Sequence, residues 1–180
     1  MKRAFWAAVI LLAFALNADA ANFNMTCTVA SSTLTLNAYD VLSGTATTTP
    51  TGSITISCTS TNNSGAVTVN YTLALTSTPA TRNLTSGANT LTYNLYTDSG
   101  ATVIWGNAGT ACTAGSNTNS GNFICGSFSV PKNSSAQQTK NYYAKIPGGS
   151  DVATGTYSEN NIAVTLTYSC NPAPTGGGTC

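Results

Sequence analysis

The sequence predicts an all-β protein built as a sandwich of two sheets. Short runs of alternating apolar and polar residues recur along the chain, as half-buried strands require. Turn signals separate these runs, and no window shows a sustained helical period. The polar positions are filled by Thr, Ser, Asn and Gly, and only 6% of the residues are charged. Thr favours strands, whereas Glu and Lys favour helices. About seven short strands in one chain are typical of a two-sheet sandwich.

Residues 1–20 are predicted to be a cleaved secretory signal. Lys2 and Arg3 precede an apolar run over residues 4–16, and Ala18-Asp19-Ala20 has the small-x-small form of a signal-peptidase site. The apolar run is shorter than the about 20 residues that a membrane-spanning helix needs. We therefore expect a chain that is secreted through the inner membrane and begins at Ala21.

Several runs along the rest of the chain predict strands. In order they are "GSITISC" (52–58), "AVTVNYTLAL" (66–75), "NTLTYNLYTD" (89–98), "FSVP" (128–131), "NYYAKIP" (141–147) and "NIAVTLTYSC" (161–170). Each of the first three runs has its apolar residues on one face. These residues are Ile54, Ile56, Cys58, Val67, Val69, Tyr71, Leu73, Leu75, Leu91, Tyr93 and Leu95. Proline ends the fourth and fifth runs, because it cannot donate a hydrogen bond to a sheet.

The last run leaves open what pairs with it. Its apolar positions, Ile162, Val164, Leu166 and Tyr168, alternate with small or polar residues. A final strand has a second edge of open N–H and C=O groups, which natural proteins pair, cover or blunt. Residues 171–180 contain two prolines, three glycines and no large apolar residue. We therefore do not expect this tail to supply the missing partner strand.

Six cysteines predict disulfides rather than a metal site. An even number of cysteines in an exported chain favours disulfides, and the absence of histidine excludes the usual mixed zinc sites. Six cysteines allow about 15 pairings. Proximity along the chain suggests Cys27–Cys58, Cys112–Cys125 and Cys170–Cys180.

The charge pattern argues against nucleic acid and lipid as partners. After residue 20 the cationic side chains are Arg82, Lys132, Lys140 and Lys145, and the anionic ones are Asp40, Asp98, Asp151 and Glu159. These charges cancel and form neither a basic stripe nor a cationic helix. A chain of about 160 residues buries roughly 70% of its unfolded surface, so its core does not depend on a cofactor. We predict no cofactor and no metal.

Catalytic residues are scarce. Without histidine there is no Ser-His-Asp or Cys-His arrangement, and the cysteines are better explained as disulfides than as nucleophiles. Two of the four carboxylates in the mature chain would suffice for glycoside cleavage. Asp40 and Asp98 lie in turn-like sequences, however, where a carboxylate accepts backbone hydrogen bonds. We predict that the protein is not an enzyme.

Two features are candidates for surface recognition. Residues 106–126 are rich in small polar residues and contain Cys112 and Cys125. This segment is either a recognition loop or a connection that a disulfide keeps compact. Trp105 and Tyr142, together with Tyr96 and Tyr143, either form an aromatic platform for a sugar or belong to the core and sheet faces. The sequence leaves both alternatives open.

Seven blocks of sequence resemble the spore coat protein U domain family, which includes subunits of archaic chaperone-usher pili. In family order the blocks are "CTVASSTLTLNAYDVLSG" (27–44), "GSITISC" (52–58), "RNL" (82–84), "LTYNLYTD" (91–98), "WG" (105–106), "YYAKIP" (142–147) and "GTYSENNIAVTLTY" (155–168). The ordered set is far more specific than any one block. The family domain would cover residues 21–170, with residues 171–180 as a tail beyond its usual end.

The resemblance implies an immunoglobulin-like sandwich that lacks one strand beside its last strand. A periplasmic chaperone would fill the gap first, and at the outer-membrane usher the N-terminal extension of another pilin subunit would replace it. Ile162, Val164, Leu166 and Tyr168 would then form the acceptor edge of a subunit that passes through the periplasm to the cell surface. The resemblance also implies the pair Cys27–Cys58.

The segment before the first cysteine departs from the family pattern. Only "ANFNMT" separates the expected cleavage site from Cys27, and although Ala21, Phe23 and Met25 alternate, six residues reach only about 20 Å as a strand. We therefore expect a subunit that accepts a strand without giving one, at a fibre tip or outside fibres as a coat component. The alternative is a self-sufficient adhesin or carbohydrate-binding module that uses residues 106–126 on a glycan or another surface.

Overall fold

The computed structural model describes residues 22–31, 47–48, 51–76, 82–106, 108, 112–153, 157 and 163–180. These ranges contain β-strands and no helix, which confirms the predicted all-β class. The strands are β1 (Met25–Ser31), β2 (Thr47–Thr48), β3 (Gly52–Ser60), β4 (Val67–Leu75), β5 (Arg82–Ser86), β6 (Asn89–Tyr96), β7 (Ile124–Val130), β8 (Ser135–Ile146) and β9 (Val164–Asn171).

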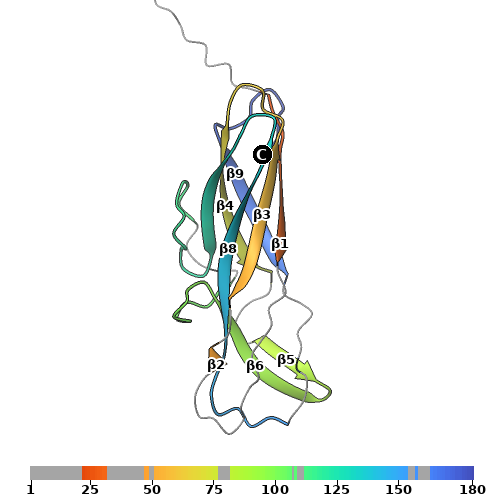
Figure 1. Cartoon of the computed structure of the whole chain (residues 1–180), viewed down its shortest axis with the longest axis vertical. Helices are drawn as coiled ribbons and strands as arrows, with labels where there is room; N and C mark the ends of the chain where they lie inside the picture. The colour runs from red at the N-terminus through yellow and green to blue at the C-terminus, as the bar shows by residue number, and fades with distance from the viewer. Residues whose placement is uncertain are drawn as a thin grey trace, which may run out of the picture.

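The strands form two sheets, as predicted for a sandwich (Figure 1). One sheet has the order β1-β3-β8-β6-β5, with β2 also paired to β8, and the other has the order β7-β4-β9. Every named pair of strands is antiparallel. β8 is the longest strand, with 12 residues, and pairs with β3 through its first part and with β6 through its last part. β5 and β6 therefore extend the first sheet at the lower end of Figure 1.

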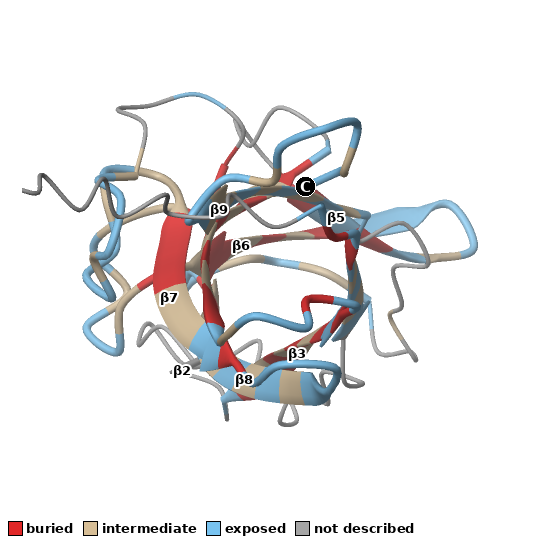
Figure 2. Cartoon of the chain, turned by 90° about the horizontal axis from the view of Figure 1, so that it is seen from above, coloured by how far each residue is buried: buried red, intermediate tan, exposed pale blue. Residues whose placement is uncertain are grey.

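The core lies between the inner faces of these strands (Figure 2). The burial patterns of β3 and β4 alternate strictly, which places Ile54 and Ile56 of one sheet and Leu73 of the other at 0% exposure. Trp105 is also fully buried, and its indole N–H donates a hydrogen bond to the carbonyl of Leu73 (3.0 Å). This bond gives the buried indole the polar partner that it needs.

Trp105 and Tyr142 are core residues, so their candidacy for surface recognition is wrong. Their exposed fractions are 0% and 2%, and their ring centroids lie 5.3 Å apart in a tilted contact. The large apolar area of the two rings explains their place, because burying such area stabilises the fold. Tyr96 and Tyr143 are cross-strand neighbours on β6 and β8 and are half-buried. The four rings therefore do not form one exposed platform.

One cross-strand pair in each sheet joins a tyrosine to a glycine. Tyr142 lies opposite Gly52, and Tyr71 lies opposite Gly126. In both pairs the tyrosine ring occupies the space that a Cβ on the glycine would need. Tyr71 also donates a hydrogen bond to the side-chain oxygen of Gln138 in the other sheet, and burial raises the pKa of its hydroxyl. The glycines are thus required for close approach of the rings.

Three disulfides connect the pairs suggested by sequence proximity. Cys27–Cys58 joins cross-strand neighbours of β1 and β3, which agrees with the pair implied by the family resemblance. Cys112–Cys125 ties the loop before β7 to that strand, and Cys170–Cys180 ties the C-terminal tail to β9. No cysteine of the chain is free.

Candidate strand-acceptor site

β9 has a partner strand on one side only. It pairs with β4, and in the described part of the chain no strand lies on its other side. The Thr76 N–H donates to the Ala163 carbonyl (2.9 Å), which extends this register by one residue. Because hydrogen-bonding direction alternates along a strand, Thr165 and Thr167 also point their backbone groups at β4. Val164, Leu166 and Tyr168 therefore direct their N–H and C=O groups away from it.

The inward side chains of β9 are less buried than those of its neighbour. Every inward residue of β4 is at most 2% exposed, whereas Val164, Leu166, Tyr168 and Cys170 are only half-buried against the core. The two strands are adjacent in one sheet and carry the same alternating pattern. The difference therefore lies on the unpaired side of β9, where the core is incompletely covered.

The start of β1 lies across from this unpaired edge. The Tyr168 hydroxyl of β9 donates to the carbonyl of Met25 (3.3 Å). The inward side chains of Cys27 and Val29 on β1 are half-buried too. The Thr61 N–H, which follows β3, donates to the Asn24 carbonyl (3.1 Å), so the backbone groups of Asn24 face β3. Because this direction alternates along a strand, Met25, Cys27 and Val29 direct their backbone groups away from β3. We call the line between these two edges, from Val164 to Cys170 on β9 and from Met25 to Val29 on β1, the seam; in the described part of the chain no strand lies in it.

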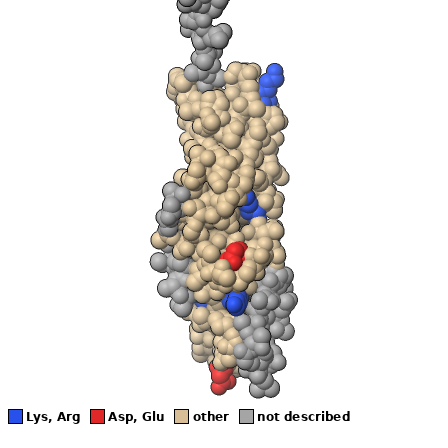
Figure 3. Space-filling model, turned by 90° about the vertical axis from the view of Figure 1, so that its left-hand side faces the viewer, with Lys and Arg blue, Asp and Glu red and all other residues tan. Residues whose placement is uncertain are grey.

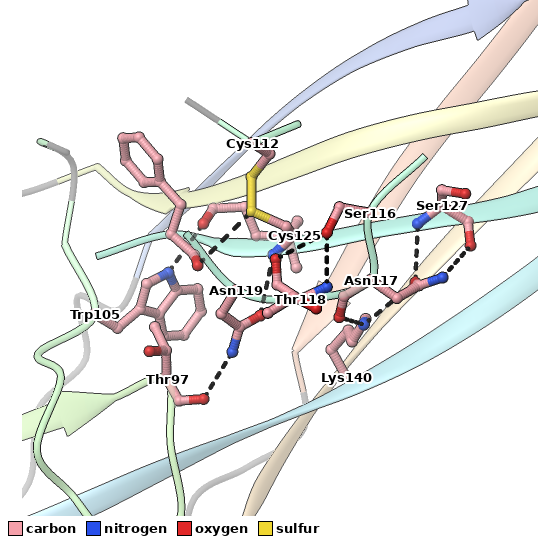
Figure 4. Close-up of a disulfide and its surroundings, with 12 residues drawn as sticks. Thr97, Trp105, Cys112, Ser116, Asn117, Thr118, Asn119, Cys125, Ser127 and Lys140 are labelled. Carbon is pink, nitrogen blue, oxygen red and sulfur yellow. Dashed lines mark hydrogen bonds between the residues drawn. A yellow bond between two sulfur atoms is a disulfide. The ribbon is translucent and has the colours of Figure 1, made fainter. Parts of the chain in front are cut away.

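The opposite edge of the same sheet is covered. β7 is the other edge strand, and two asparagines of the preceding loop hydrogen-bond to its outer backbone groups (Figure 4). The Asn117 amide accepts from the Ser127 N–H (3.0 Å) and donates to the Ser127 carbonyl (3.2 Å). Asn119 accepts from the Cys125 N–H (3.2 Å) and donates to the Thr97 carbonyl (2.8 Å). The loop therefore replaces a neighbouring strand at β7, which is one way that proteins protect a sheet edge.

The rest of the loop is held by similar contacts. The Gly115 N–H donates to the side-chain oxygen of Asn70 on β4 (2.6 Å), and the Lys140 ammonium donates to the Asn117 carbonyl (3.1 Å). Desolvation lowers the pKa of Lys140. These bonds and the Cys112–Cys125 disulfide agree with the alternative that the loop is a compact connection. The asparagines give it a further structural role that the sequence did not reveal.

The C-terminal tail folds back on the N-terminal segment. Thr179 forms a parallel bridge with Asn24, in which the Met25 N–H donates to the Thr179 carbonyl (2.9 Å) and the Thr179 N–H to the Phe23 carbonyl (3.2 Å). The tail does not pair along β9, in agreement with its composition. Its attachment to Asn24 was not predicted.

The N-terminal segment belongs to the core of its own chain. Phe23 and Met25 are each 2% exposed, and Met25 is the first residue of β1. The alternation in "ANFNMT" therefore continues the chain's own first strand. A donor segment that used these two residues would have to remove both from this core.

Asp98 caps a turn. The side chain of Asp98 accepts hydrogen bonds from the backbone N–H groups of Thr102 and Val103 and from the Thr102 hydroxyl, so its predicted role as a turn cap is correct. Slight desolvation raises the pKa of Asp98, but these hydrogen bonds outweigh it and hold the pKa below its usual value. Asp40, Glu159 and Ile162 lie outside the described residues.

The surface carries few charges. Figure 3 shows only a few scattered cationic and anionic side chains on the described part of the face that is turned to the viewer. In the described ranges no three acidic, cysteine or histidine side chains gather into a possible metal site. The same ranges contain no helix that is long and apolar enough to cross a membrane.

Comparison with known proteins identifies the family. The sequence profile of the Spore Coat Protein U domain matches residues 12–167, which is most of the chain. No curated protein matches the sequence. The family consists of structural, pilin-type domains of chaperone-usher surface fibres. The two-sheet arrangement and the disulfides agree with the fold of this family. Because the profile also matches most of the sequence, the chain belongs to the Spore Coat Protein U domain family.

Proposed function

We propose that this protein is an exported, non-enzymatic subunit that completes its sandwich with a β-strand from another polypeptide. The observation that supports the proposal is the contrast between the two edges of the β7-β4-β9 sheet. Asparagine side chains cover the β7 edge, whereas β9 has half-buried apolar side chains and, among the described residues, no strand on its second side. A strand added in the seam would pair with the open backbone groups and bury these side chains.

In this proposal the strand comes first from a periplasmic chaperone and then from another pilin subunit, delivered at an outer-membrane usher. The acceptor residues are Val164, Leu166 and Tyr168, and Ile162 belongs to the same alternating face. Each large apolar side chain of the incoming strand that becomes buried contributes about 1.5–3 kcal/mol. The backbone groups that β9 and β1 direct into the seam are the hydrogen-bond partners of this strand.

The protein accepts a strand but does not offer one from its described N-terminal segment. Phe23 and Met25 are already part of its own core. With cleavage after Ala20, only Ala21 and Asn22 would precede them. This arrangement suits a subunit at the tip of a fibre or a coat component that does not polymerise.

A synthetic peptide tests strand acceptance. A five- to seven-residue peptide with alternating apolar residues should raise the melting temperature of the mature protein, while a peptide with the same composition in a non-alternating order should not. At 100 times its Kd the peptide stabilises by about 2.7 kcal/mol. For a domain of this size that corresponds to a rise of roughly 5–11 °C.

Two neighbouring substitutions provide the matched control. Leu166→Asn places a polar amide on the half-buried inner face of β9, whereas Thr167→Asn changes the exposed outer face one residue later. Peptide binding should weaken at least tenfold in the first variant and remain unchanged in the second. If the unsubstituted protein melts at the same temperature with and without saturating peptide, the proposed function is wrong.

A further inference from the structure

The C-terminal tail occupies one end of the seam. Thr179 hydrogen-bonds to the edge of β1 at Met25, and Cys180 is bonded to Cys170 on β9. The two residues thus contact both edges at the point where β1 begins and β9 ends. Further along, Val164 and Leu166 on β9 and Val29 on β1 have no such cover from the tail.

The attachment of the tail is specific. The Asn24 side chain accepts hydrogen bonds from both the N–H and the hydroxyl of Thr179 (3.2 and 3.1 Å). Gly178 lies so close to the Phe23 backbone that a Cβ at this position would collide with it. A glycine, a bridging threonine and a disulfide therefore hold three successive residues in place.

We infer that residues 178–180 are a stop that closes one end of the seam and limits the length of the strand it accepts. The inference rests on the proposed function, because it assigns a length and an alignment to the same incoming strand. Beside β9 the stop makes no described contact with Val164, Leu166 or Tyr168, and the Tyr168 hydroxyl itself reaches Met25 on β1. The stretch from Val164 to Tyr168 spans five residues, or about 13–17 Å of strand. The preferred partner is an extended segment with three alternating apolar side chains that ends at the stop.

The alternative is that the disulfide only fastens the tail to the domain. The two explanations differ in how binding depends on peptide length. If the tail is a stop, the tail already occupies the position that a fourth apolar residue of the peptide, at the end facing Cys180, would need. If the tail is only fastened, that residue gains a site opposite Cys170.

The experiment measures the Kd of three peptides. The core peptide has three alternating apolar residues. Each of the two longer peptides adds one polar and one apolar residue to it, one at the N-terminus and the other at the C-terminus. In the unsubstituted mature protein, one of the two extensions should leave the Kd unchanged. The same extension should tighten binding about 10- to 100-fold when the tail is released, the range expected for burial of one more large apolar side chain. The end that responds also reports the direction of the strand.

Two variants release the tail in different ways. Gly178→Ala forces the tail away from Phe23 and keeps every disulfide, whereas the double substitution Cys170→Ser/Cys180→Ser removes the covalent link. Gly65→Ala is the control, since a Cβ there meets nothing within 4 Å. If both extensions tighten binding to the unsubstituted protein, the stop is refuted and strand acceptance stands. If the core peptide binds none of the proteins, the proposed function fails, and this inference with it.

Discussion

Removal of the Asn117 side chain should expose the β7 edge and destabilise the fold. The Asn117→Ala substitution deletes one hydrogen bond from the Ser127 N–H and one to the Ser127 carbonyl, at 3.0 and 3.2 Å, and two longer ones, at 3.4 Å each, that Gln138 and Lys140 donate to the Asn117 side-chain oxygen. A typical hydrogen bond contributes about 0.5–1.5 kcal/mol net. Ser127 is only half-buried, so water replaces part of the loss. We expect the free energy of unfolding to fall by about 1–2 kcal/mol and the melting temperature to fall by roughly 2–8 °C.

Urea unfolding followed by circular dichroism measures this change. Asn117→Asp retains the acceptor for the Ser127 N–H, loses the donor to its carbonyl and places a carboxylate beside the Lys140 ammonium, so it should destabilise less than the alanine variant. Thr118→Ala is the control, because it alters an exposed side chain of the same loop. Equal stability of the Asn117→Ala and Thr118→Ala variants would refute the idea that the loop protects the edge.

Three further predictions concern the core and the turn. Gly126→Ala should displace the Tyr71 ring and cost about 1–3 kcal/mol in urea unfolding, whereas Gly65→Ala, in open space, should change stability by less than about 0.5 kcal/mol; equal effects would contradict the proposed ring contact. Phe23→Ala should cost about 3–5 kcal/mol by the same assay, since the ring is 2% exposed, and an unchanged stability would show that the segment is not part of the core. The Asp98 pKa is lower in the folded protein than in the unfolded chain, so its stabilisation is present above pH about 4 and is lost as the pH falls through the folded pKa. Asp98→Asn should therefore flatten the loss of stability as the pH falls below about 4, and an unaltered pH profile would exclude this role.

Strands with a clear apolar alternation could be predicted from sequence, and others could not. The sequence predicts β3, β4 and β6 because apolar residues or cysteine recur at every second position in each of them. The first half of β8, "SAQQTK", carries mostly polar residues on both faces and gave no such signal. It forms a strand because β3 provides a complete set of backbone partners. Tertiary pairing, rather than local pattern, determines this part of the sheet.

The candidate site shows the same division. The alternating face of Val164, Leu166 and Tyr168 is visible in the sequence, but its incomplete burial depends on which strands surround it. The contacts of Asn117 and Asn119 could not be foreseen, because short polar residues in a loop have many local partners available. Trp105 was ambiguous for a related reason, since an indole can serve either as a contact surface or as a core residue.

The scarcity of charge visible in Figure 3 has a consequence for the conditions in which the protein works. Attraction between ion pairs at a surface weakens as dissolved salt screens them. A protein surface made mostly of hydroxyl and amide groups has few ion pairs that salt could weaken. We therefore expect the melting temperature of this protein to be nearly the same at low and at high salt concentration.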